Sequence, residues 1–196
     1  MRLVKQPPKQ PIKAFSSAES WERWLAKNGS RSPGIWLRLF KKGSGVASVS
    51  YDEALDGALC YGWIDGQLKT HDEVSWLRRF TPRRARSVWS KRNRERVERL
   101  AKAGRLKAAG RKEVRAAQED GRWKAAYDSP KEMRVPPDFL RALARNRRAA
   151  AFFRSLNRAN VYAIAWRLQT ARRAETREKR IREFVAMLAR SEKWHP

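Results

Sequence analysis

Residues 50–68, SYDEALDGALCYGWIDGQL, contain a helix start, a helix end and a strand in direct succession. Ser50 and Glu53 have the spacing of a capping box, in which each side chain binds the backbone N–H of the other residue. Apolar residues then recur at helical spacing, and Gly62 is suited to ending the helix. The residues that follow predict a strand with a bulge or tight bend at Gly66.

The flanking sequence extends this mixed α and β region to about residue 85. On the N-terminal side, Ser16 and Glu19 also have capping-box spacing and predict a helix that ends near residue 28. Residues 35–40 alternate between two faces and predict a strand, and residues 74–80 predict another. The N-terminal half therefore supplies both kinds of secondary structure.

After residue 87 the pattern becomes helical, with apolar residues at i, i+3, i+4 and i+7 in several segments. The sequence thus predicts an α+β fold: a small N-terminal α+β unit with a short antiparallel sheet, followed by a helical basic C-terminal region. We expect a flexible basic arm at residues 1–14, an α+β core with its following helices at residues 15–122, and a helical region at residues 123–196.

The composition is that of a folded protein with a large positive charge. Of 196 residues, 41% are hydrophobic, and 46 Lys and Arg against 20 Asp and Glu give a net charge of +26. Residues 77–196 carry 35 basic and 12 acidic residues. Such a field attracts polyanions such as nucleic acid, although an Arg-rich composition on solvated helix faces would look the same. Because no DNA-binding motif is present, we expect any nucleic-acid binding to be nonspecific.

Two features predict a cytoplasmic protein with no membrane span. The single cysteine, Cys60, cannot form an intramolecular disulfide, which suits a reducing compartment. The N-terminal sequence has no apolar core of the signal-peptide type, and no run of about 18 apolar residues occurs anywhere in the chain.

No group of residues has the pattern of a catalytic or metal centre. His71 and His195 are the only histidines and are far apart in the sequence, and Cys60 has no second cysteine beside it. The acids between Asp52 and Asp56 lie at a predicted helix start, where they are ordinary partners of the helix dipole. We therefore expect no catalytic residues, no metal and no cofactor.

Two segments are candidates for binding a small anion or a phosphorylated ligand. In residues 61–66 a Trp and an acid lie between two glycines, an arrangement that can place Asp65 in a cleft. In residues 79–93 arginines precede a predicted helix start at Ser87, where free N–H groups and arginine side chains both favour anions. The alternative is a packed Trp and a simple helix cap. The candidate anion cleft consists of Trp63, Asp65, Gly66, Arg79, Thr81, Arg83, Arg84, Ser87, Trp89, Ser90 and Asn93.

This cleft leads to two geometric expectations. Asp65 should lie within salt-bridge reach of Arg79, Arg83 or Arg84, because a partly desolvated acid needs a partner. The helix that begins near Ser87 should present its N-terminus to a pocket, where an anion or a carboxylate offsets the charge of the arginines.

The same segments resemble a known family. The pattern of YDEAL at 51–55, GWIDG at 62–66, RFTPRR at 79–84 and SVWS at 87–90 resembles the YdeI/OmpD-associated, or bacteriocin-protection, family. A C-terminal set that includes Asn160, Tyr162, Trp166 and Arg167 resembles it too, so the resemblance extends from about Phe15 to the end of the chain. It implies a bacterial stress or resistance protein and no accepted reaction.

Three functions remain open from the sequence. The first is a non-enzymatic protein of the bacteriocin-protection type with an anion-binding cleft. The second is a nonspecific nucleic-acid-binding protein that uses its basic helices. The third is an enzyme that acts on a phosphorylated or acidic metabolite with Asp65 as its base.

Overall fold

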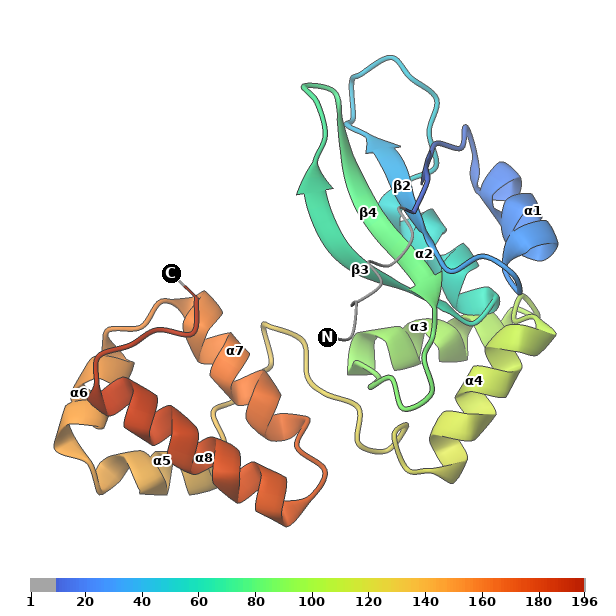
Figure 1. Ribbon diagram of the computed structural model, residues 1–196. Coiled ribbons are helices and arrows are strands. Elements are labelled where there is room, and N and C mark those ends of the chain that lie inside the picture. The colour runs from blue at the N-terminus through green and yellow to red at the C-terminus, as the bar shows by residue number, and fades with distance from the viewer. Residues whose placement is uncertain (1–9, 196) are drawn as a thin grey trace, which may run out of the picture. The chain divides into compact units, whose positions relative to one another are not determined.

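Alternating apolar and polar residues produce one four-stranded sheet in the computed structural model, which describes residues 10–195 (Figure 1). The strand order is β1-β2-β4-β3, with β1 parallel to β2 and the other neighbours antiparallel. The sheet is therefore mixed rather than purely antiparallel. The strands are β1 (Ile12–Lys13), β2 (Ile35–Phe40), β3 (Trp63–Thr70) and β4 (Ser75–Pro82).

Eight helices complete the described part of the chain and confirm the predicted α+β class. Four of them follow the order α1 (Ala18–Asn28), α2 (Tyr51–Cys60), α3 (Lys91–Lys102) and α4 (Ala108–Glu119). The other four form the C-terminal part: α5 (Pro137–Ala144), α6 (Arg147–Arg154), α7 (Arg158–Gln169) and α8 (Ala174–Ala189).

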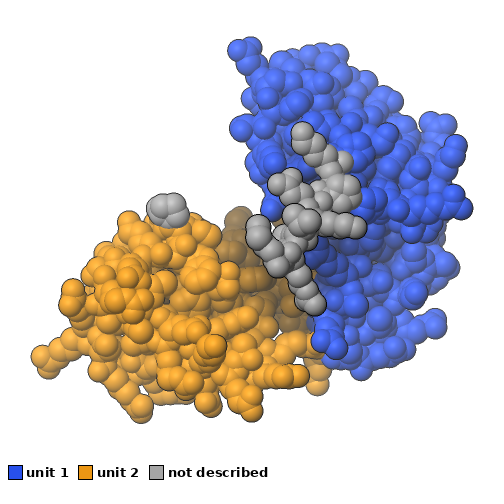
Figure 2. Space-filling view, in the orientation of Figure 1, with its two compact units in different colours: residues 1–87, 93–123 blue, residues 88–92, 124–196 orange. Residues whose placement is uncertain are grey.

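The chain divides into two compact units, which Figure 2 shows in different colours. The first unit comprises residues 1–87 and 93–123 and contains the sheet. The second unit comprises residues 88–92 and 124–196 and contains α5 to α8.

The core of the first unit lies between one face of the sheet and the helices α1 and α2. Alternate residues of β2 point into it, so that Ile35, Leu37 and Leu39 are buried. Trp21 of α1 is fully buried, lies 5.7 Å from the Phe80 ring, and donates a hydrogen bond of 2.9 Å from its indole N–H to the backbone of α2. The aromatic side chains thus join the two helices to the sheet.

Both predicted N-terminal caps form, one of them shifted by a residue. Ser50 and Glu53 form the capping box of α2, as predicted. In α1 the box is made by Ser17 and Ser20, not by Ser16 and Glu19. Ser17 has the extended backbone that an N-cap needs, and the Ser20 hydroxyl closes the box in place of a carboxylate.

Residues 1–9 of the expected basic arm lie outside the described residues. The chain that follows them pairs with the sheet, because Ile12 and Lys13 form β1 beside β2. Gln10 also contacts this region, since its amide nitrogen donates a hydrogen bond of 2.9 Å to the Pro33 carbonyl.

The core of the second unit is formed by the apolar stripes that the sequence shows at helical spacing. Phe139 of α5, Ile164 of α7 and Leu188 of α8 are fully buried, and Phe184 packs edge-on against Phe139 at 6.4 Å. Phe153 of α6 completes the cluster at 5.7 Å from Phe139. Within residues 10–195, no helix has the length and apolar character needed to cross a bilayer.

Candidate functional site

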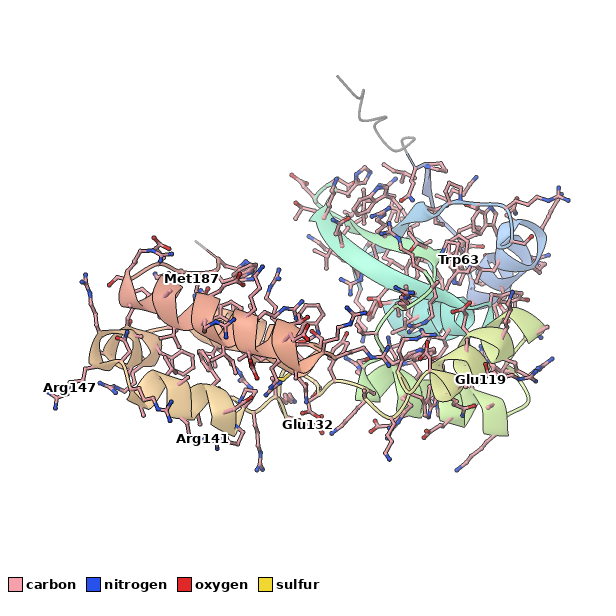
Figure 3. All side chains as sticks on the ribbon, turned by 60° about the horizontal axis from the view of Figure 1, so that its bottom comes forward. Trp63, Glu119, Glu132, Arg141, Arg147 and Met187 are labelled. Carbon is pink, nitrogen blue, oxygen red and sulfur yellow. The ribbon has the colours of Figure 1, made fainter. Side chains whose placement is uncertain are left out.

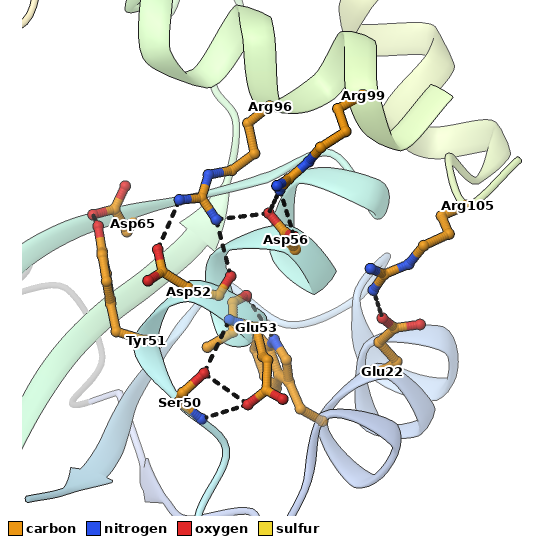
Figure 4. A network of polar contacts seen from close by, with 12 residues as sticks. Glu22, Ser50, Tyr51, Asp52, Glu53, Asp56, Asp65, Arg96, Arg99 and Arg105 are labelled. Carbon is orange, nitrogen blue, oxygen red and sulfur yellow. Dashed lines mark hydrogen bonds and ion pairs between the residues drawn. The ribbon is translucent and has the colours of Figure 1, made fainter. Parts of the chain in front are cut away.

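Asp65 lies on the core-facing side of β3 and forms an ion pair with Arg78 of β4. Its carboxylate accepts a hydrogen bond of 2.9 Å from Arg78 Nε and a second one from Arg78 Nη2. It also accepts one of 2.8 Å from the hydroxyl of Tyr51, which lies beside Asp65 in Figure 4. The side chains of Asp65 and Arg78 are 12% and 23% exposed. Burial, followed by the adjacent Asp65 charge, raises the pKa of the Tyr51 phenol.

The expectation that Asp65 pairs with Arg79, Arg83 or Arg84 is wrong, and the strand register explains why. Asp65 is paired with Phe80 across the sheet, so its neighbours on the same face are Phe80 and Arg78. Arg79 points to the opposite face, where its Nε donates a hydrogen bond of 2.8 Å to Gln10. A shift of one residue along a strand reverses the face, and the sequence alone does not fix this register.

Two further candidates, Gly66 and Thr81, lie on the strands of the sheet. Gly66 is exposed at the irregularity between Asp65 and Leu68, which confirms the predicted bulge. Thr81 is still part of β4 and pairs with Ile64. These residues shape the strands rather than a binding surface.

Trp63 and Arg83 are the candidates that do line a common pocket. This pocket has a volume of about 300 Å³ and is bounded by the end of α1, the turn after α2 and the first half of α4. Trp63 is buried and donates a hydrogen bond of 3.0 Å from its indole N–H to the Gly29 carbonyl. Arg83 is 7% exposed, and its backbone N–H donates to the Gly62 carbonyl at 2.9 Å.

The helix expected to begin near Ser87 begins at Lys91 instead. Ser87 closes a turn: its hydroxyl accepts a hydrogen bond of 3.0 Å from the Arg84 N–H, and its own N–H donates to the Arg84 carbonyl at 2.9 Å. Arg86 has a φ of 69°, a left-handed conformation, and belongs to the turn at residues 85–86. Ser87 therefore stabilises a loop, and the expected helix end beside the arginines does not exist.

The last three candidates are divided between the two units. Trp89 and Ser90 belong to the second unit, where Ser90 pairs with Tyr127 and the buried Trp89 accepts a hydrogen bond from the Tyr127 N–H. Asn93 lies on α3 in the first unit. The eleven candidate residues therefore belong to both units, and the cleft that they would form together stays a prediction.

A network that the sequence did not reveal joins α2 to α3. Arg96 of α3 is 2.7 Å from the carboxylate of Asp52 and 2.8 Å from that of Asp56, and Arg99 also contacts Asp56 at 2.9 Å (Figure 4). Burial alone would lower the pKa of Arg96, but its hydrogen bonds to Asp56 and Asp52 outweigh this effect and raise the pKa above its ordinary value. The two acids are four residues apart and the two arginines are three apart, so each pair lies on one side of its helix. This spacing could have predicted that the two helices face each other. Arg96 and Arg99 thus join α3 to α2 through ion pairs.

A different set of arginines has no such partners. Residues 139–174 contain nine arginines and no Asp or Glu. Eight of the nine are exposed, and the six that lie between residues 141 and 158 make no contact with a carboxylate within residues 10–195. Figure 3 shows two of them, Arg141 and Arg147, pointing outward from α5 and α6. The six are Arg141, Arg145, Arg147, Arg148, Arg154 and Arg158, called the arginine face below.

Within the described residues, no three His, Cys, Asp or Glu side chains come together as they would around a metal ion.

Comparisons with known proteins identify two family segments. Residues 13–113, more than half of the chain, match the family described as Domain of unknown function (DUF8412). Residues 132–191 match the family described as Bacteriocin-protection, YdeI or OmpD-Associated. No curated protein and no solved structure matches the chain.

The two matches follow the architecture of the chain. The motifs between residues 51 and 90 that resemble the bacteriocin-protection family lie within the first match, whereas the C-terminal set around Asn160 lies within the second. The chain therefore belongs to the family described as Domain of unknown function (DUF8412), and its helices α5 to α8 form a domain of the Bacteriocin-protection, YdeI or OmpD-Associated family.

Proposed function

We propose that this protein binds nucleic acid nonspecifically through the arginine face of its second unit. The observation that supports the proposal is the contrast between paired and unpaired arginines. In the first unit, Arg78, Arg96 and Arg105 contact carboxylates at the sheet or between helices. On the arginine face, six exposed side chains have no described carboxylate within reach. Their charge is therefore available to a partner.

The local backbone adds to this positive potential. Arg147 and Arg148 begin α6 and Arg158 begins α7, and neither helix has an acid in its first turn. Positive side chains at the positive end of a helix dipole cost a few tenths to about 1 kcal/mol each. This cost is offset when an anion lies beside them, which favours a polyanionic partner.

Arginine suits phosphate in particular. A planar guanidinium donates two parallel hydrogen bonds to one phosphate, and several such groups can neutralise several phosphates of a nucleic-acid backbone. An anionic membrane is the less favoured partner, because Val88, Leu140 and Trp194 are the only large apolar side chains recorded as exposed among the described residues of the second unit. Surface-binding helices usually insert more apolar area than this.

The biological setting follows from the same proposal. We propose a non-enzymatic role in the cytoplasm, where nucleic acid is abundant, and protection against bacteriocins as the process it serves. The candidate small-anion cleft is our second choice: Trp63 and Arg83 line one pocket, but no ligand group is assigned to it.

The test is a charge reversal on the arginine face. The triple variant Arg147→Glu, Arg148→Glu, Arg154→Glu should weaken binding to a labelled 20-base-pair DNA duplex at least about tenfold at 50 mM salt, measured by fluorescence anisotropy. Binding should be the same for duplexes of unrelated sequence.

The control changes the net charge equally in the first unit. Arg23→Glu, Lys27→Glu and Arg31→Glu replace three exposed basic residues in and just after α1. If both triple variants lose the same affinity, the total charge and not the arginine face governs binding. If vesicles of anionic lipid bind the arginine face while DNA does not, the partner is a membrane.

A further inference from the structure

The chain after α8 turns back and ends beside the start of α7 (Figure 1). There the amide of Asn160 binds both backbone groups of one residue. The His195 N–H donates to Asn160 Oδ1 at 2.8 Å, and Asn160 Nδ2 donates to the His195 carbonyl at 3.3 Å. Asn160 is 0% exposed, and its Nδ2 also donates to Asn157 at 3.0 Å. A buried amide is thus satisfied by an extended peptide backbone.

Trp194, the residue before His195, makes two side-chain contacts. The guanidinium of Arg167 lies 3.8 Å from the centre of the Trp194 ring, and the Phe184 ring meets this indole edge-on at 5.7 Å. Trp194 nevertheless remains 40% exposed. The indole is therefore held on two sides by cation–π and aromatic contacts while remaining accessible to solvent.

We infer that Asn160, Arg167 and Phe184 form a peptide-binding site that the chain's own tail occupies. The ligand is an extended peptide of a partner protein in which a Trp precedes a residue with a free backbone N–H and carbonyl. The His195 side chain makes none of the hydrogen bonds that hold the tail, so the site recognises backbone and one aromatic ring.

Backbone strain makes the tail, residues 192–195, a replaceable occupant. The tail is held by the contacts of Trp194 and His195. The turn that returns it places Ser191 at φ 60°, a left-handed conformation that is disfavoured for a residue with a Cβ atom. A separate peptide avoids this turn. The site does not depend on nucleic-acid binding, since none of the six side chains of the arginine face takes part in it.

The experiment uses the full chain and a fluorescein-labelled peptide with the sequence of residues 191–196, SEKWHP. A tethered tail competes at an effective concentration near the millimolar range, so the wild-type chain should bind the peptide weakly. Trp194→Ala weakens the tethered tail, and this variant should bind the peptide at least tenfold more tightly than the wild type, as measured by anisotropy.

Two changes should abolish that gain. A peptide N-methylated at the His nitrogen keeps every side chain but cannot donate to Asn160, and Asn160→Ala in the Trp194→Ala chain removes the acceptor. Gln169→Ala, which removes an exposed amide at the other end of α7, is the control and should leave binding unchanged. Equal binding to wild type and Trp194→Ala, or binding that ignores N-methylation, would overturn the inference. The N-methylated peptide tests it even if Asn160→Ala unfolds.

Discussion

Replacing Asp65 by Asn should destabilise the first unit, because it removes the only carboxylate that contacts Arg78 within the described chain. Asparagine keeps the shape of the side chain but loses its charge. It leaves the guanidinium of Arg78 partly buried without a counter-ion, and the Tyr51 hydroxyl then faces an amide instead of a carboxylate.

The magnitude follows from the burial of the pair. Breaking a buried ion pair by removing one partner costs about 3–5 kcal/mol, whereas a fully exposed pair contributes about 0–1 kcal/mol. With side chains 12% and 23% exposed, the Asp65–Arg78 pair lies between these two cases and closer to the buried one, so we expect a loss of about 2–3 kcal/mol. For a unit of roughly 120 residues this corresponds to a fall in the melting temperature of about 10 °C.

The assay is calorimetry, which separates the unfolding of the two units if each melts independently. A double-mutant cycle with Arg78→Met isolates the pair, because Met fills the space without a charge. The double variant should be more stable than the sum of the single losses predicts. Asp72→Asn is the control: Asp72 lies in the turn between β3 and β4, and its pair with Arg38 is more exposed, at 37% and 31%. Because asparagine can still accept the hydrogen bonds of Ser75 and Val74, this variant should lower the melting temperature less than Asp65→Asn does.

If Asp65→Asn lowers the melting temperature no more than Asp72→Asn does, the Asp65–Arg78 pair does not stabilise the first unit as stated. If the effects of Asp65→Asn and Arg78→Met simply add, the two side chains do not stabilise each other.

Three other predictions concern single positions. The hydrogen bond from Arg177 lowers the pKa of Asp138, so its stabilisation should be complete above about pH 4 and lost as the pH falls through the lower folded-state value; Arg177→Met should remove this acid-dependent fall in melting temperature. Gly110→Ala would place a methyl group against the carbonyl oxygen of Cys60, and should cost about 1–3 kcal/mol in urea unfolding. Burial raises the pKa of Cys60 to about 11, so labelling with a disulfide reagent at pH 8 should be slow until urea unfolds the first unit.

Local patterns were sufficient to predict most of the elements. The strand at residues 35–40 formed with the predicted bounds, because strict alternation with one buried face leaves a single register for the core. The capping box at Ser50 also formed as predicted, because its contacts lie within four residues of each other. Such features depend on neighbours in the sequence and therefore need no knowledge of the fold.

The candidate site was harder to predict because its geometry depends on contacts between elements. The partner of Asp65 is set by the register between β3 and β4, in which a slip of one residue exchanges Arg78 for Arg79. The helix expected at Ser87 was displaced to Lys91 by a turn that a serine stabilises as well as it caps a helix. Which arginines remain unpaired is likewise decided by tertiary ion pairs such as that of Arg96.

The proposal that the arginine face binds nucleic acid is tested by the salt dependence of DNA binding. If its six arginines each neutralise one phosphate, the logarithm of the association constant should fall against the logarithm of the salt concentration with a slope of about −5. Between about 50 and 200 mM salt the affinity should then drop roughly 1000-fold. In the triple variant Arg147→Glu, Arg148→Glu, Arg154→Glu, the slope should be less steep by about 3. A slope near zero, or one that this variant leaves unchanged, would contradict the proposal.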